Sequence, residues 1–191
     1  MEVLLIDHED SFSYNLQQSL RMCGAEVRII QATEIRNSII DKYHHIILSP
    51  GPGLPLEYLA TLECIDQFKF QKSFFGVCLG LQSIGVVFGA ELFKQSEPQH
   101  GVVKSIIRQN TEVESCLSTL PRTFEATLYH SWAIIEDSLP QELVITSKSE
   151  DGIIMSIIHE ALDIEAVQFH PESFLTQRGN EILYNWLYKK R

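Results

Sequence analysis

The first half of this 191-residue chain alternates short β-branched runs with amphipathic stretches of helical length. Such alternation is typical of parallel strands joined by crossover helices, because each parallel connection must return across a face of the sheet. Strands are predicted near residues 3–6, 26–30, 46–48 and 74–77, and helices near residues 11–22, 59–69 and 79–88. The pattern therefore predicts an α/β fold built on a parallel sheet.

The second half contains strand-like runs separated by turn residues, which indicates antiparallel additions to that sheet. These runs lie at residues 102–106, 124–129, 143–147 and 153–158, followed by a last strand at 164–169 and a helix at 180–189. Four apolar residues share one face of that helix: Ile182, Leu183, Trp186 and Leu187. No linker, repeat or low-complexity tract interrupts the chain, so a single domain over residues 1–191 is expected.

The chain has a net charge of -10, from 15 Lys and Arg residues against 25 Asp and Glu residues. This charge disfavours binding to nucleic acid or to an anionic membrane, and the longest basic cluster is the terminal Lys189-Lys190-Arg191. The N-terminal apolar run is short and lacks a basic flank, and no segment approaches the ~20 apolar residues of a membrane span. A cytoplasmic location is expected.

The four cysteines have no regular spacing and form no CxxC pair; they are Cys23, Cys64, Cys78 and Cys116. In a chain of this size, neither a zinc site nor a disulfide framework is indicated. We therefore expect reduced thiols. An HExxH motif is also absent, so no metal site is predicted, and without a GxxxxGK(S/T) or GxGxxG motif the sequence predicts no cofactor.

One cysteine has a distinctive setting, because Gly76-Val77-Cys78-Leu79-Gly80 lies where a predicted strand ends and a helix begins. Small flanking residues permit the tight strand-to-helix turn of a nucleophile elbow, which would expose the Cys78 thiol above the sheet. Unpaired N–H groups in the first helical turn favour a thiolate and could hold an oxyanion. Gly85 and Gly89 are expected to continue the helix and let it lie close to the sheet. Alternatively, Cys78 is a small buried residue in a glycine-rich contact.

A nucleophilic thiol needs a base, and His170 has the most suitable setting among the seven histidines. The apolar strand that precedes it stops at His170-Pro171-Glu172, so an imidazole and a carboxylate emerge together at the end of a sheet. An extended i, i+2 spacing can point both side chains the same way, and Glu172 could then orient the ring. The alternative is a strand-end histidine beside a solvated glutamate.

The loop Pro50-Gly51-Pro52-Gly53 is a third candidate feature. A proline-stiffened loop with intervening glycines can bring backbone N–H groups close to a ligand, which suits an oxyanion hole or an anchor for a substrate amide. Three prolines within residues 49–55 also exclude a regular strand or helix there. A plain tight turn is the alternative explanation.

Taken in order along the chain, these segments resemble the class I (triad) glutamine amidotransferases. Within that family they are most similar to the stand-alone subunits of anthranilate synthase and para-aminobenzoate (aminodeoxychorismate) synthase. The matching segments are residues 5–16 (LIDHEDSFSYNL), 48–53 (LSPGPG), 76–82 (GVCLGLQ), 100–101 (HG), 129–131 (YHS) and 168–173 (QFHPES). The resemblance covers practically the whole chain. It implies a flavodoxin-like, three-layer fold with a mostly parallel central sheet, helices on both faces and an antiparallel extension.

The resemblance also implies a role for each matching residue. Cys78 would be the nucleophile, His170 the general base and acid, and Glu172 the residue that orients His170. Backbone N–H groups of Gly51 and Leu79 would form the oxyanion hole. The positions that would bind L-glutamine are Gly51, Pro52, Gly53, Gln82, Ser131 and Trp132. The implied products are glutamate and ammonia, with the ammonia delivered to a chorismate-binding synthase subunit that makes aminodeoxychorismate or anthranilate.

Three positions depart from the family pattern: Leu81 replaces a histidine, Trp132 a leucine and Leu128 an arginine. None of them removes a member of the Cys-His-Glu set. Two other functions stay open, namely a docking or regulatory module for the synthase and a γ-glutamyl hydrolase-like peptidase. The guanylate synthetase relatives are expected to fit less well, because they are fused to large synthetase domains.

Overall fold

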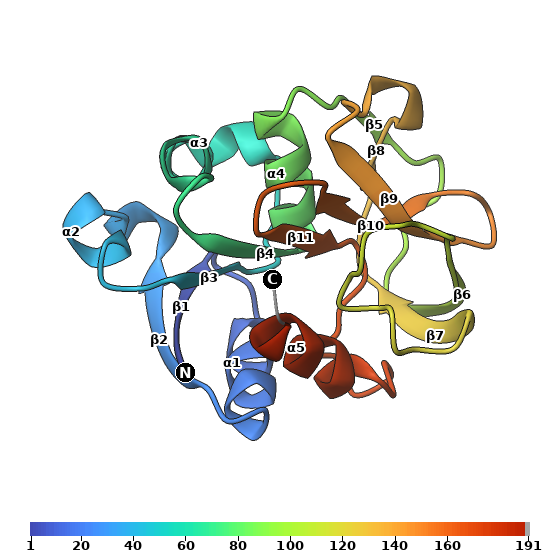
Figure 1. Ribbon diagram of the computed structural model, residues 1–191. Helices are drawn as coiled ribbons and strands as arrows, with labels where there is room; N and C mark the ends of the chain where they lie inside the picture. Colours follow the sequence, from blue (N-terminus) through green and yellow to red (C-terminus); the bar gives the residue numbers. More distant parts are fainter. Residues whose placement is uncertain (190–191) are drawn as a thin grey trace.

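The computed structural model describes residues 1–189, which form an α/β fold around a nine-stranded sheet (Figure 1). Residues 190 and 191 of the predicted terminal basic cluster lie outside the described residues. The strand order is β2-β1-β3-β4-β11-β10-β9-β6-β7. The parallel part consists of β1 (Glu2–Asp7), β2 (Glu26–Gln31), β3 (His45–Leu48), β4 (Ser73–Val77) and β11 (Ile164–Val167). The antiparallel extension consists of β10 (Ile154–His159), β9 (Leu143–Ser149), β6 (Val102–Arg108) and β7 (Thr123–Leu128).

Helices cover both faces of the parallel part, as Figure 1 shows. Helices α1 (Ser13–Met22) and α5 (Gly179–Tyr188) lie together on one face, and α3 (Leu59–Phe68) and α4 (Leu79–Val87) lie on the other. Strand β1 divides its side chains between them: Val3 and Leu5 join the apolar cluster of α1 and α5, whereas Leu4 and Ile6 join that of α3 and α4. This alternation produces the three-layer fold, and the predicted fold class is confirmed.

The elements that the sequence did not predict are all short. Strands β5 (Leu92–Lys94) and β8 (Trp132–Ile134) form a separate antiparallel pair, and α2 (Asn37–Ile40) is one turn long. Residues 1–189 also contain three 3-10 turns: η1 (Ala32–Glu34), η2 (Pro55–Glu57) and η3 (Glu136–Ser138). Three or four residues are too few to display a period. The predicted irregular loop ends at Pro55, which begins η2 because the fixed φ of proline suits the first position of a helix.

The glycine that lets the glycine-rich helix approach the sheet is not one of the two that the sequence predicted. Helix α4 ends at Val87, so Gly89, with φ +98°, lies beyond it, and Gly85 faces Ile134 of β8 instead of the large sheet. The close approach to the sheet occurs at Gly80, where an added Cβ would lie 2.5 Å from the carbonyl oxygen of Leu48. Only glycine fits at that contact.

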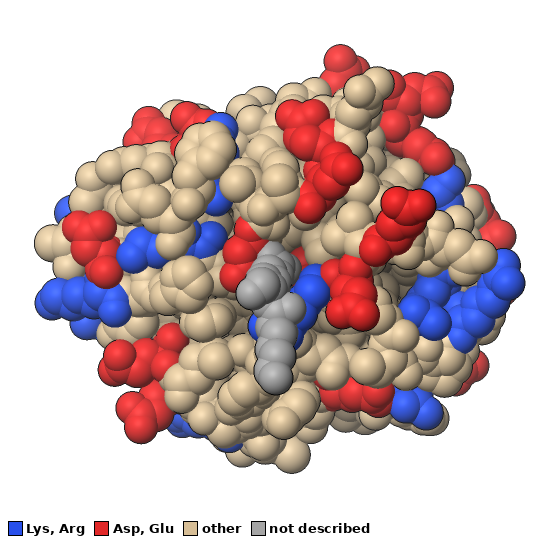
Figure 2. Space-filling model, in the orientation of Figure 1, with Lys and Arg blue, Asp and Glu red and all other residues tan. Residues whose placement is uncertain are grey.

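The surface reflects the excess of acidic residues. Figure 2 shows acidic side chains spread over the visible face, with basic side chains among them and at the left and right edges of the view. Within residues 1–189, no helix combines the length and the apolar character needed to cross a bilayer. The cysteines predicted to be reduced, Cys23, Cys64, Cys78 and Cys116, are all buried, and no disulfide joins any two of them.

Candidate active site

The pairing of β4 with β11 creates the site. These strands are parallel neighbours with Val77 opposite Val167, and the N–H of Cys78 donates to the carbonyl oxygen of Val167 at 2.8 Å. Because parallel strands end at the same edge of a sheet, the residues that follow β4 and β11 lie side by side. Cys78 and His170, which are 92 positions apart in sequence, therefore meet at one edge.

Cys78 occupies the strained turn that its sequence setting predicts. Its φ of +53° and ψ of -100° are unfavourable for a residue with a side chain, and it caps the N-terminus of α4. Gly76 allows the turn, since a Cβ there would lie 2.4 Å from the carbonyl carbon of Gly80. The expectation of an exposed thiol is wrong, however. Cys78 is only 6% exposed because it lies at the base of a pocket.

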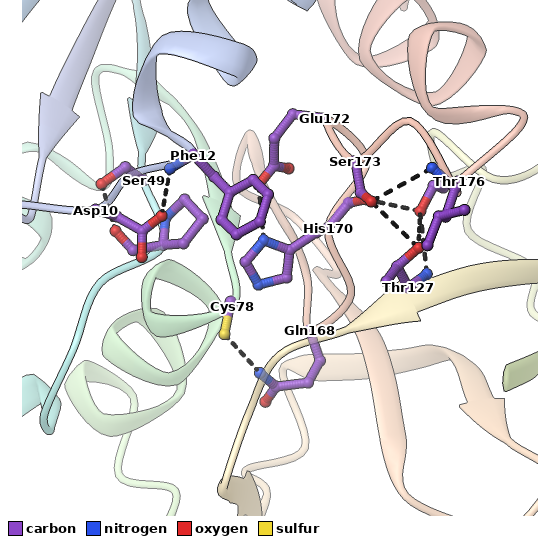
Figure 3. Close-up of polar contacts among 12 residues, drawn as sticks. Asp10, Phe12, Ser49, Cys78, Thr127, Gln168, His170, Glu172, Ser173 and Thr176 are labelled. Atoms are coloured by element: carbon purple, nitrogen blue, oxygen red, sulfur yellow. Dashed lines mark hydrogen bonds and ion pairs between the residues drawn. The ribbon is translucent and has the colours of Figure 1, made fainter. Parts of the chain in front are cut away.

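His170 and Glu172 form a buried pair. Nδ1 of His170 lies 2.7 Å from Oε1 of Glu172, with side-chain exposures of 2% and 0%. Burial lowers the pKa of His170, but the charge of Glu172 and the nearby Cys78 thiol outweigh it, and the pKa is raised well above its ordinary value. Figure 3 shows the ring between the Glu172 carboxyl group and the Cys78 sulfur. Within residues 1–189, Nε2 of His170 makes no hydrogen bond of regular geometry.

Two aromatic rings exclude water from this pair. Phe12 and Tyr129 each contact the His170 ring edge to face, at centroid distances of 5.4 and 5.0 Å, and they contact each other at 4.8 Å. Their apolar surfaces keep the environment of His170 and Glu172 weakly polar. Electrostatic interactions within the pair are therefore stronger than they would be in water.

Hydroxyl groups fix the backbone on which His170 lies. The N–H of His170 donates to the carbonyl oxygen of Thr127 at 3.0 Å, and the hydroxyl of Thr176 donates to the carbonyl oxygen of His170 at 2.8 Å. Thr176 also accepts from the N–H of Thr127 at 3.0 Å. Ser173 completes the cluster seen in Figure 3. The turn after β11 is thereby joined to the end of β7.

A pocket of about 220 Å³ opens above Cys78. It is small beside the roughly 300–1,000 Å³ of drug-binding sites, which suits a compact ligand. Its lining includes every predicted oxyanion and glutamine-binding position: Gly51, Pro52, Gly53, Leu79, Gln82, Ser131 and Trp132. Tyr129 and His130 also line it, and the family resemblance implies no role for either residue. Burial lowers the pKa of His130 to about 4, so this ring is neutral at physiological pH.

The loop after β3 lies against the start of α4. A Cβ added to Gly51 would come within 2.6 Å of both Leu79 and His8, so this position excludes any side chain. Leu79 is the first residue of α4, and its N–H has no acceptor within the helix. The N–H groups of Gly51 and Leu79 thus lie on adjoining segments at the pocket wall.

His8 contacts the loop after β3 and links it to α3. Its Nδ1 lies 3.1 Å from the hydroxyl of Ser49, and its Nε2 lies 3.0 Å from the hydroxyl of Thr61. The side chain is completely buried, and burial lowers the pKa of His8 to about 4. The sequence offered only the matching segment 5–16 as a signal for this contact.

A further contact was not predicted, although its residue lies inside the matching segment 168–173. Nε2 of Gln168 donates to the sulfur of Cys78 at 3.4 Å (Figure 3). Gln168 also accepts a hydrogen bond of 3.2 Å from Gln82, which donates to the carbonyl oxygen of Trp132 at 2.9 Å. The departure from the family pattern at Trp132 does not affect the bond from Gln82, because Gln82 contacts only the main chain of Trp132. The other departures, Leu81 and Leu128, pack into the apolar clusters.

Comparisons with known proteins agree with this geometry. The family model described as glutamine amidotransferase class-I matches residues 4–190. The chain belongs to the class-I glutamine amidotransferase family. It is 40% identical over 192 residues to anthranilate synthase component 2 of Mycobacterium tuberculosis, covering 98% of this chain and 82% of that protein. It is 38% identical over 192 residues to anthranilate synthase component 2 of Pseudomonas aeruginosa, covering 97% and 94%.

A solved structure shares the amidotransferase fold. A protein from Thermoplasma acidophilum, described as a candidate subunit of GMP synthase, superposes with a TM-score of 0.86 at 25% identity, covering 98% of this chain and 92% of that one. That match is a separate protein of similar length. The expectation that guanylate synthetase relatives are fused to larger domains therefore does not separate them from this amidotransferase.

The polar groups of the site suit acyl transfer by a thiol. Within residues 1–189, no three His, Cys, Asp or Glu side chains converge as a metal site would require. The chemistry offered consists of a thiol, an imidazole whose pKa a buried carboxylate raises, and the N–H groups of the first turn of α4, which have no acceptor within the helix. Acyl transfer requires a nucleophile, a base and oxyanion donors, and these groups are of the chemical types that can fill those roles.

Proposed function

We propose that this amidotransferase hydrolyses L-glutamine to glutamate and ammonia, with Cys78 as nucleophile, His170 as general base and acid, and Glu172 as the orienting residue. The observation that carries the proposal is the buried His170–Glu172 pair at 2.7 Å beside Cys78, at the base of a pocket sized for an amino acid. A raised pKa of His170 favours transfer of the thiol proton to the imidazole.

In the first half of the reaction, the Cys78 thiolate attacks the γ-carboxamide carbon of glutamine. The developing oxyanion accepts hydrogen bonds from the N–H groups of Gly51 and Leu79, which lie on adjoining segments. The C–N bond then breaks, and the proton on His170 passes to the departing nitrogen. This step leaves a γ-glutamyl thioester, ammonia and a neutral imidazole.

In the second half, His170 takes a proton from water while the water oxygen attacks the thioester carbon. The C–S bond breaks with its electron pair on sulfur, so the thiolate and the protonated imidazole return together. Glutamate is released. The remaining pocket residues, Pro52, Gly53, Gln82, Ser131 and Trp132, hold the substrate in this scheme.

We further propose that the ammonia passes to a separate chorismate-using synthase subunit in the cytoplasm. The names of the 40% and 38% identical relatives support anthranilate as the product. Aminodeoxychorismate is the second candidate product, because the acceptor is bound by the partner and not by this chain. Glutamine-dependent product formation with each type of synthase distinguishes the two.

The decisive experiment compares the wild-type chain with Cys78→Ser in complex with a synthase subunit. Labelling by 6-diazo-5-oxo-norleucine should modify Cys78, and Cys78→Ser should lose glutamine-dependent synthesis while ammonia-dependent synthesis survives. A docking or regulatory module would show equal synthesis with both proteins at any glutamine concentration. A γ-glutamyl hydrolase would cleave γ-glutamyl peptides in preference to glutamine. Unchanged glutaminase turnover in Cys78→Ser would refute the role of Cys78.

A further inference from the structure

A backbone carbonyl sets the orientation of two buried amides beside the nucleophile. The carbonyl oxygen of Trp132 can only accept, so the group that Gln82 presents to it at 2.9 Å must be its NH₂. The same NH₂ lies 3.2 Å from the amide of Gln168, which must therefore present its oxygen to Gln82. The NH₂ of Gln168 is then left facing the sulfur of Cys78 at 3.4 Å.

Gln168 has little freedom to leave this position. Its side chain is completely buried, and its own N–H donates to the carbonyl oxygen of Met155 at 2.8 Å. It follows β11 directly and precedes His170 by two residues, so it lies on the strand end that brings the base to Cys78. Figure 3 shows Gln168 and His170 approaching the sulfur from different directions.

We propose that Gln168 is a further catalytic residue, which stabilises the Cys78 thiolate by donating an N–H hydrogen bond to its sulfur. This inference rests on the proposed role of Cys78 as nucleophile. A hydrogen bond to an ionised acceptor is stronger than one to a neutral acceptor, so the Gln168 amide favours the thiolate over the thiol. It acts at two points: when His170 takes the thiol proton, and when the C–S bond of the thioester breaks and the electron pair returns to sulfur.

Two substitutions distinguish the effect of the Gln168 N–H donor from the effect of packing by its side chain. Gln168→Met keeps the length of the side chain and removes the donor. Gln168→Glu keeps the oxygen that accepts from Gln82 but presents a second oxygen to the sulfur, where a negative charge opposes the thiolate. Gln109→Met is the matched control, because Gln109 is exposed and its side chain donates to the carbonyl oxygen of Ile107.

The measurement is the rate at which iodoacetamide alkylates Cys78 in the full chain, followed by peptide mass analysis over a range of pH. We expect the alkylation profile of Gln168→Met to move to higher pH, with a rate at neutral pH about tenfold below wild type, as loss of a hydrogen bond to a charged group implies. Gln168→Glu should react more slowly still, and Gln109→Met at the wild-type rate.

Thermal unfolding of each variant controls for structural damage. If Gln168→Met does not fold, Gln168→Glu carries the same test, since it preserves the size and the partner of the side chain. A folded Gln168 variant with wild-type alkylation at every pH overturns the proposal, even if its glutaminase turnover falls. Failure of the proposed function is a distinct result, because the wild-type chain in complex with a synthase would then release no glutamate from glutamine.

Discussion

The carbonyl oxygen of Val167 accepts a 2.8 Å hydrogen bond from the N–H of Cys78. This bond extends the ladder between β4 and β11 by one residue, just where the chain turns into α4. The last strand in the sequence is thus inserted between the parallel strands and the antiparallel extension. The distance between the thiol and the residues after β11 is set by strand pairing and does not depend on a flexible loop.

Gly80→Ala should destabilise the protein and displace α4. A Cβ there would lie 2.5 Å from a backbone oxygen of Leu48, and overpacking of this kind costs about 1–3 kcal/mol. Gly85→Ala is the matched control in the same helix, because its Cβ meets the movable end of Ile134. The midpoint of urea unfolding should be clearly lower for Gly80→Ala than for Gly85→Ala. Equal midpoints would show that α4 can move away from the sheet without cost.

Glu172→Gln should change how stability depends on pH. Burial lowers the pKa of His170 but Glu172 raises it more, so the folded pKa lies above the unfolded one. Stability from this pair is then fully present below about pH 6.5, the unfolded pKa, and is lost as pH rises through the folded pKa. The gap in unfolding free energy between wild type and Glu172→Gln should narrow as pH is raised from neutral to alkaline. A difference in unfolding free energy that widens with rising pH would contradict the conclusion that Glu172 raises the pKa of His170.

His8→Asn should show the opposite trend with pH. Because the folded pKa of His8 is about 4 and the unfolded pKa is about 6.5, the unfolded chain binds the extra proton between these values. The unfolding free energy of wild type exceeds that of His8→Asn by an amount that should fall by roughly 2 kcal/mol as pH is lowered from about 7.5 to about 5. Urea unfolding at both pH values measures this difference. A constant advantage would mean that the folded and unfolded pKa values of His8 are equal, so that burial does not lower the pKa.

Thr176→Val should reduce glutamine turnover through the position of His170. The substitution removes the bond to the carbonyl oxygen of His170 and the acceptor for the N–H of Thr127, both buried, at a cost of about 1–3 kcal/mol. Steady-state kinetics should show a larger fall in kcat than change in KM. Thr119→Val, which removes two exposed hydrogen bonds, is the control and should leave both constants near wild type. Equal effects of the two variants would count against a link between Thr176 and catalysis.

The sequence predicted those strands and helices whose apolar residues form a continuous run or recur at helical spacing. Strand β1 shows a continuous apolar run whose side chains enter both cores, and α5 places Ile182, Leu183, Trp186 and Leu187 on one buried face, as expected. The short strands β5 and β8 escaped prediction because pairing, and not an apolar repeat, holds three residues extended.

The candidate site was predictable where local chemistry is distinctive. The setting of Cys78 between glycines and the His170-Pro171-Glu172 sequence both indicated a role, and the structure brings these residues together. Gln168 and His8 were missed because their significance lies in the long-range contacts to Cys78, Ser49 and Thr61. A buried amide or imidazole carries no local signal of which partner it will meet.

The positive φ of Cys78 has an energetic consequence. A side chain in that region of backbone space costs on the order of 1–3 kcal/mol, which glycine would avoid. Replacement of Cys78 by glycine would therefore relieve the backbone strain and remove the thiol from the pocket. The fold thus holds a thiol in the pocket at an energetic cost that a residue without a side chain would not carry.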